Sequence, residues 1–83
     1  IGGKKILSKT ISVNTVESEI AKPLEGVQNK FKNIEIGSYP FFRLGKVGVS
    51  IVMRSTEPEQ IEDCVKQIQS FIKQKKIKIL RSE

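Results

Sequence analysis

The chain has 83 residues, enough for one small domain, and carries 15 lysines and arginines against 9 aspartates and glutamates, a formal charge of +6. It has no histidine, which removes the commonest general base and the commonest metal ligand. The single cysteine excludes an intramolecular disulfide and a cysteine-based zinc site. No apolar run approaches the roughly 18 residues that span a membrane, and no signal-peptide pattern opens the chain. We therefore expect a small cytoplasmic module of mixed α and β structure, with no membrane partner.

The chain opens with Ile1-Gly2-Gly3 rather than with Met. We expect one domain over residues 1–83, cut from a longer protein, with an ordered core from about residue 5 to about residue 80. A tag remnant explains the first two or three residues equally well.

The first half of the chain predicts a strand, a helix and a second strand. Residues alternate from Lys9 to Val13, and this strand can begin as early as Lys5. Apolar residues at helical spacing then predict a helix over 15–31, in which Asn14 and Glu17 fit a capping box. Pro23 is expected to kink this helix or to delay its regular start. A strand over 33–39 follows.

The second half predicts a strand, a helix and a short last strand. The alternation over 46–54 is the strongest strand signal, and a connection bounded by glycines, 37–45, joins it to the strand before. Thr56 is expected to cap the second helix, with Pro58 in its first turn and Glu59 completing the capping box. A strand over 77–80 closes the chain.

This order, β-α-β-β-α-β, predicts a ferredoxin-like α+β fold. We expect a four-stranded antiparallel sheet in the order 4-1-3-2, with both helices on one face. The other face stays open. Its expected residues are Ser8, Thr10, Ser12, Gly48, Ser50, Val52, Arg54 and Lys78.

The positive charge invites a nucleic-acid ligand. Sheets of this kind that bind RNA stack bases on aromatic residues of the third strand, and the strand over 46–54 has none. A nucleic-acid partner is therefore not expected. A basic set at the chain's end is a candidate anion contact, although such a run is more often a solvated helix end. The candidate residues are Arg54, Lys73, Lys75, Lys76 and Lys78.

The segment 37–43 is the most unusual stretch, because it holds three of the five aromatic residues. One interpretation is a loop packed on the core or on a neighbouring domain. The alternative is an aromatic wall for a planar ligand. The candidate ligand or interdomain contacts are Gly37, Ser38, Tyr39, Pro40, Phe41, Phe42 and Arg43.

Residues suited to catalysis do not stand out. Cys64 lies at the edge of the apolar stripe of the second helix and is expected to be a packed small hydrophobe. The carboxylate pairs sit at helix starts or on outer helix faces. We therefore name no catalytic residue and no metal ligand.

Several of these features together resemble a known accessory segment, which follows the molybdopterin-binding-like domain of CinA-like (competence/damage-inducible A) proteins and of FAD synthases. The resemblance spans about Leu7 to Phe71, and its most specific element is Gly-Ser-Tyr-Pro. It is carried by Ser12-Val13, Glu17, Ile20-Ala21, Leu24, Ile36-Gly37-Ser38-Tyr39-Pro40, Val47, Val49, Ile51, Met53 and Ser55.

The resemblance implies a parent protein that makes FAD or hydrolyses nucleotide pyrophosphate bonds, and it does not distinguish the two. It implies a preceding molybdopterin-binding-like domain as partner, and FAD or a related nucleotide with a divalent metal as the parent's cofactors. No cofactor and no catalytic residue is carried over to this chain. We expect a non-catalytic accessory domain that supports docking or homodimerisation beside the nucleotide pocket. The alternative is a free-standing module that binds nucleic acid or anions through its basic surface.

Overall fold

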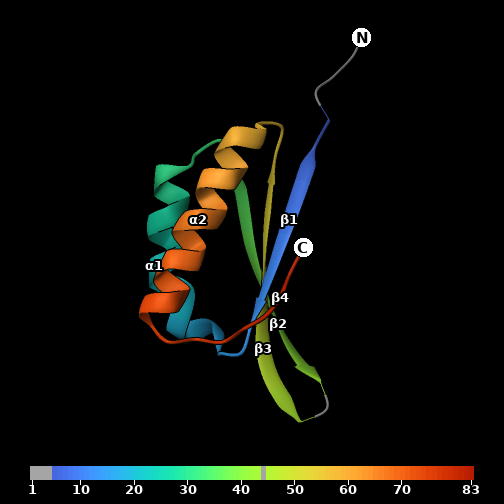
Figure 1. Cartoon of the computed structure of the whole chain (residues 1–83), viewed down its shortest axis with the longest axis vertical. Helices are drawn as coiled ribbons and strands as arrows, with labels where there is room; N and C mark the ends of the chain where they lie inside the picture. The colour runs from blue at the N-terminus through green and yellow to red at the C-terminus, as the bar shows by residue number, and fades with distance from the viewer. Residues whose placement is uncertain (1–4, 44) are drawn as a thin grey trace.

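The computed structural model describes residues 5–43 and 45–83. The predicted order of elements is confirmed (Figure 1). The elements are β1 (Leu7–Val13), α1 (Glu17–Lys30), β2 (Glu35–Arg43), β3 (Lys46–Ser55), α2 (Pro58–Gln74) and β4 (Ile79–Ser82). The opening Ile1-Gly2-Gly3, on which the expectation of an excised domain rests, lies outside the described residues.

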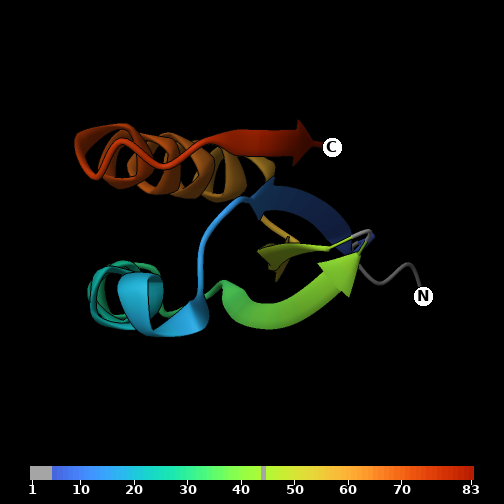
Figure 2. The same ribbon diagram turned by 90° about the horizontal axis from the view of Figure 1, so that it is seen from below.

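The four strands form one sheet in the order β2-β3-β1-β4, which is the predicted order read from the other edge. All three neighbouring pairs are antiparallel. Both helices cover the same face of the sheet, and the other face is left open by the described part of the chain (Figures 1 and 2). The ferredoxin-like α+β architecture is therefore confirmed.

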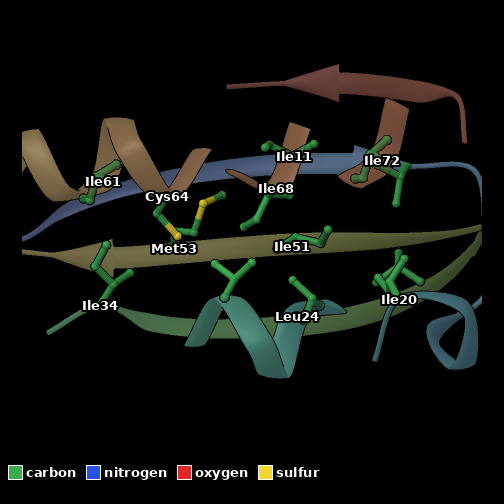
Figure 3. Close-up of a cluster of buried hydrophobic side chains, with 13 residues drawn as sticks. Ile11, Ile20, Leu24, Ile34, Ile51, Met53, Ile61, Cys64, Ile68 and Ile72 are labelled. Carbon is green, nitrogen blue, oxygen red and sulfur yellow. The ribbon is translucent and has the colours of Figure 1, made fainter. Parts of the chain in front are cut away.

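A single apolar core fills the space between the helices and the covered face of the sheet (Figure 3). Strand β3 supplies its centre, because Val49, Ile51 and Met53 alternate onto this face and are completely buried. Ile68 of α2 is equally inaccessible to solvent. The full set is Ile11, Val13, Ile20, Leu24, Val27, Ile34, Val49, Ile51, Met53, Ile61, Cys64, Ile68 and Ile72.

Helix α1 begins later than the pattern predicted. Its first residue is Glu17, and the N-cap position belongs to Val16, whose side chain cannot accept a hydrogen bond. The predicted cap at Asn14 is wrong, because Asn14 lies two residues before the N-cap position. Its backbone N–H donates to Lys78 O at 2.9 Å, where the chain enters β4. The helix then runs through Pro23 to Lys30.

The side chain of Gln28 joins the end of α1 to the start of β2. Its Nε2 donates to Ile34 O at 2.6 Å and to Phe31 O at 3.2 Å, and its Oε1 accepts from the backbone N–H of Ile36 at 3.1 Å. These bonds connect backbone groups that follow the helix end to backbone groups of β2. They also hold the edge strand β2 against the helical layer.

Helix α2 begins at Pro58, which lies in its first turn as predicted, but Thr56 is not its cap. Glu57 occupies the N-cap position. The hydroxyl of Ser55 makes the hydrogen bonds at the start of this helix. It accepts from the N–H of Glu57 at 3.0 Å and donates to Asn33 O at 3.1 Å.

The end of α2 shifts the last strand away from its predicted place. Lys76 has a positive φ of 59°, and the N–H of Ile77 donates back to Ile72 O at 3.0 Å. This is the Schellman arrangement, in which a residue in the left-handed region closes the helix. Ile77 then packs on the core rather than in the sheet. Strand β4 consequently runs over Ile79–Ser82, and Lys78 precedes it.

Candidate functional site

The segment predicted as a connection is part of a strand. β2 pairs with β3 residue by residue from Glu35 opposite Arg54 to Arg43 opposite Lys46. The expected loop over 37–43 is therefore wrong. Pro40 is tolerated in the middle of β2 because this strand lies at the edge of the sheet, where a missing N–H costs no ladder bond. Gly45, with φ of +76°, belongs to the tight connection.

Strand alternation divides the candidate contacts between the two faces of the sheet. Ser38 lies opposite the buried Ile51, so Ser38, Pro40 and Phe42 belong to the covered side. The open side receives Gly37, Tyr39, Phe41 and Arg43. The aromatic cluster seen in the sequence is thus not one surface but two. Ser38 itself donates its hydroxyl to Glu17 Oε1 of α1 at 2.8 Å.

Two aromatic rings of β2 lie over glycines on the open side. A Cβ atom at Gly37 would stand 3.0 Å from the hydroxyl of Tyr39 and 3.1 Å from its ring. A Cβ atom at Gly48 would stand 2.8 Å from two ring carbons of Phe41 and closer still to the para carbon. Neither glycine is needed for a turn, since both lie within the strand ladder. Each provides the room in which a ring lies on the backbone.

The open side contains a hollow of about 400 Å³ that spans all four strands. Ser12 of β1 and Ser50 of β3 form its floor, and their hydroxyl oxygens are 3.0 Å apart in a hydrogen bond. The remaining lining residues come from the two edge strands and the chain's end. They are Phe41, Arg43, Leu80, Arg81 and Glu83.

The end of the β2–β3 hairpin carries an exposed apolar pair on the covered side. β1 reaches only as far as Val49, so residues 41–43 and 45–48 form an arm without a third strand. In Figure 1 this arm extends beyond the ends of both helices. Phe42 and Val47 face each other across it and are 72% and 42% exposed. Other apolar side chains of this size on that face are in the core or packed against it.

The predicted basic contacts are not brought together. Lys73, Lys75, Lys76 and Lys78 are exposed at the end of α2 and in the connection to β4. Arg54 lies on the open side at the opposite end of β3, across from Ser8 and Glu35. The open-side assignment holds for Arg54 and the serines, but not for Lys78, which precedes the strand.

Other reactive groups are few in the described part of the chain. Cys64 is completely buried, as predicted, and burial raises the pKa of its thiol to about 11. Residues 5–43 and 45–83 contain no group of three or more His, Cys, Asp or Glu side chains that could hold a metal ion. The same residues include no helix long and apolar enough to cross a membrane.

Comparison with known families identifies the chain. The FAD synthase middle-domain family matches residues 5–80. The chain belongs to this family. The match confirms the FAD-synthase part of the resemblance, and kinship with CinA-like proteins stays a prediction. None of the curated proteins matches the chain in sequence.

The solved structures that share the fold of this FAD synthase middle domain include two designed proteins. "De novo designed protein Foldit4" is 22% identical with a TM-score of 0.62, over 94% of this chain and 93% of that one. "De novo designed protein Ferredog-Diesel" is 19% identical with a TM-score of 0.54, over 100% of this chain and 88% of that one. At such identities the likeness concerns the fold alone.

The residues of the hollow were only partly foreseen from the sequence. Phe41 and Arg43 were among the candidates, and the serines were placed on the open face. Arg81, Leu80 and Glu83 were not singled out, because the last strand was expected two residues too early. The charge alternation at the end of the chain was the signal available for them.

Proposed function

We propose that this domain is a non-catalytic accessory module of an FAD-synthase-type protein, and that it docks on a second copy of the same protein through its hairpin arm. The observation that carries the proposal is the exposed pair Phe42 and Val47. Large apolar side chains gathered on an exposed surface mark interaction sites in soluble proteins. The arm holds them beyond the helical layer, where a partner can reach them (Figure 1).

A second copy suits the arm better than a domain joined to the same chain. Val47 lies eight residues along β3 from Ser55, which pairs with the first residue of β1, so the arm and the start of β1 are about 26 Å apart. The last residue, Glu83, pairs with Thr10 near the middle of β1 and runs away from the arm. A domain joined before β1 therefore starts from the far end of the sheet, and one joined after Glu83 starts from a strand that is heading away from Phe42.

We place the nucleotide chemistry of the parent in a neighbouring domain. The family's description puts domains of this kind in the middle of FAD synthases. The described residues do not fit a divalent metal, since no ligand set gathers among them. We propose that the metal and the nucleotide that reacts belong to a preceding molybdopterin-binding-like domain, and that kinship with CinA-like proteins has the same origin. We also propose that the parent acts in the cytoplasm.

The docking role is tested by measuring the mass of the 83-residue chain in solution by light scattering. We expect a dimer that dissociates in the double variant Phe42→Ser, Val47→Ser. Ile6→Ser is the matched control, because Ile6 is also exposed, at 68%, but lies beyond the other end of the sheet. A monomer at every concentration, or equal dissociation in the control, contradicts docking on a second copy.

The accessory role is tested separately in the parent protein. Deleting residues 1–83 is expected to change its oligomeric state, its FAD-synthesis or pyrophosphate-hydrolysis activity, or both. An internally deleted parent with unchanged mass and unchanged activity contradicts the role.

A further inference from the structure

The hollow on the open face has the composition of a ligand site rather than of a bare sheet surface. Its floor, Ser12 and Ser50, uses the smallest hydroxyl side chains, so the backbone of the two central strands stays within reach. The two hydroxyls bond to each other at 3.0 Å, and each retains lone pairs or a rotatable proton for a ligand. A volume of about 400 Å³ lies in the range of small-molecule sites.

Two arginines approach the hollow from opposite edges of the sheet. Arg43 comes from β2 and Arg81 from β4, two strands that lie three strand spacings, about 14 Å, apart. Arg81 is in register with Ser12, Ser50 and Tyr39, so Arg43 also lies four residues, about 13 Å, further toward the hairpin end. The planar guanidinium group presents several donors in a fork that matches phosphate oxygens. Arg81 is already ion-paired with Glu83, and both side chains are largely exposed. Glu83 therefore brings an acceptor to the same rim without burying a charge.

Phe41 supplies a flat apolar surface beside these charges. Its ring lies on Gly48, and Phe41 is one of the residues that line the hollow. Leu80 adds an apolar side chain from the opposite edge. An aromatic ring on the open face of a four-stranded sheet is a common platform for stacking a nucleobase or a similar ring.

From these residues we infer that the hollow binds a mononucleotide. The phosphate monoester lies against Arg43 and Arg81, the flat ring system stacks on Phe41, and the hydroxyls of the sugar or sugar alcohol meet Ser12, Ser50 and Glu83. A nucleotide has phosphate oxygens that accept from the arginines, a ring that stacks on Phe41, and hydroxyl groups that donate to the serines and to Glu83. This inference goes beyond the docking role and does not depend on it, because Phe42 and Val47 lie on the other side of the sheet.

The test titrates the 83-residue chain with FMN and AMP by calorimetry, and with riboflavin and inorganic phosphate as partial ligands. At least one mononucleotide is expected to bind, with riboflavin and phosphate each at least about tenfold weaker, because each lacks half of the recognised features. No binding of either mononucleotide up to about 1 mM overturns the inference. Equal affinity for riboflavin or for phosphate alone overturns it as well.

Variants locate the site. Arg43→Gln and Arg81→Gln are each expected to weaken binding about tenfold or more, since each removes a charge-assisted contact to phosphate. Arg54→Gln is the matched control: this arginine is on the same open side but at the far end of β3, and the affinity is expected to stay within about twofold. A loss of affinity in Arg54→Gln equal to that in Arg43→Gln overturns the inference, because binding would then depend on the total positive charge of the open face and not on particular arginines.

Phe41→Leu tests the stacking contact while retaining an apolar cover over Gly48. Weaker binding of the mononucleotide, by about threefold to tenfold, with unchanged binding of phosphate is expected. Unchanged binding of the mononucleotide overturns the assignment of the ring. Thermal unfolding of each variant confirms that it is folded. A uridine oligomer that binds more tightly than both mononucleotides overturns the choice of a small ligand in favour of single-stranded RNA.

Discussion

The two faces of the sheet are built from the same strands but from different residues. On β3, Val49, Ile51 and Met53 point to the helices and are completely buried. Ser50 and Val52, between them, point to the open side and are partly accessible. The covered face is closed and apolar, whereas the open face combines hydroxyls, arginines and rings that lie on glycines. The comparison teaches that the part of the covered face under the helices accounts for folding, which leaves the open face and the hairpin arm free for recognition.

The largest expected effect is on the covered face. Ile51→Ala is expected to lower the free energy of unfolding by about 2–5 kcal/mol, because it leaves a cavity in a closed core. Val52→Ala, one residue further on the same strand, is expected to cost about 1 kcal/mol, since its side chain is only partly buried. Urea unfolding measures both. Equal losses would break the distinction between the faces.

A second effect on the covered face depends on pH. Burial raises the pKa of the Cys64 thiol from 9.0 to about 11, so the folded state keeps its proton in a range where the unfolded state loses it. The contribution of this thiol to the free energy of unfolding is fully present below pH 9 and is lost as the pH rises toward about 11. The loss is of order 1–3 kcal/mol. Cys64→Ala should lack this component in unfolding curves recorded between these pH values; the same pH dependence in the variant contradicts it.

On the open face, the contact between Phe41 and Gly48 is tested by a double-mutant cycle. Gly48→Ala is expected to cost about 1 kcal/mol, because the new methyl group must displace the ring. In a Phe41→Ala background the same change should be neutral or stabilising, since alanine restricts the unfolded chain more than glycine does. Denaturant midpoints give the coupling energy. A zero coupling energy means that the ring does not lie on the glycine in solution.

The smallest expected effect concerns Lys76, the residue that ends helix α2. Lys76 has a φ of 59°, which costs a residue with a side chain more than it costs glycine. Lys76→Gly is therefore expected to raise the free energy of unfolding by about 0.5–1 kcal/mol, and the midpoint of thermal unfolding by a few degrees. Lys75→Gly is the control and should destabilise, because Lys75 has a right-handed helical backbone.

The covered face could be predicted from the sequence, and the reason is periodicity. Val49, Ile51 and Met53 alternate over a strand with no competing signal, and α2 shows a regular apolar stripe. The fold class and the strand order followed from the order of these elements. That two designed proteins share this fold at 22% and 19% identity is consistent with patterning of this kind.

The open face was harder to predict because its residues depend on tertiary context. Gly37 and Pro40 are turn signals in isolation, but on an edge strand the first makes room for a ring and the second lacks only a bond that faces outward. The helix caps were misplaced for a similar reason, since Ser55 and Asn14 have partners distant in sequence. Arg81 lies in β4 because Lys76 ends α2 in the left-handed region and the last strand begins two residues later than its alternation predicts.

The most direct test of the division between the faces is to map amide chemical shifts of the chain during a titration with FMN. We expect the largest changes on the open side, at Ser12, Phe41, Ser50 and Arg81, with the core-facing residues of α1 and α2 unchanged. Changes confined to the lysines at the end of α2, or no changes at all, would contradict the account.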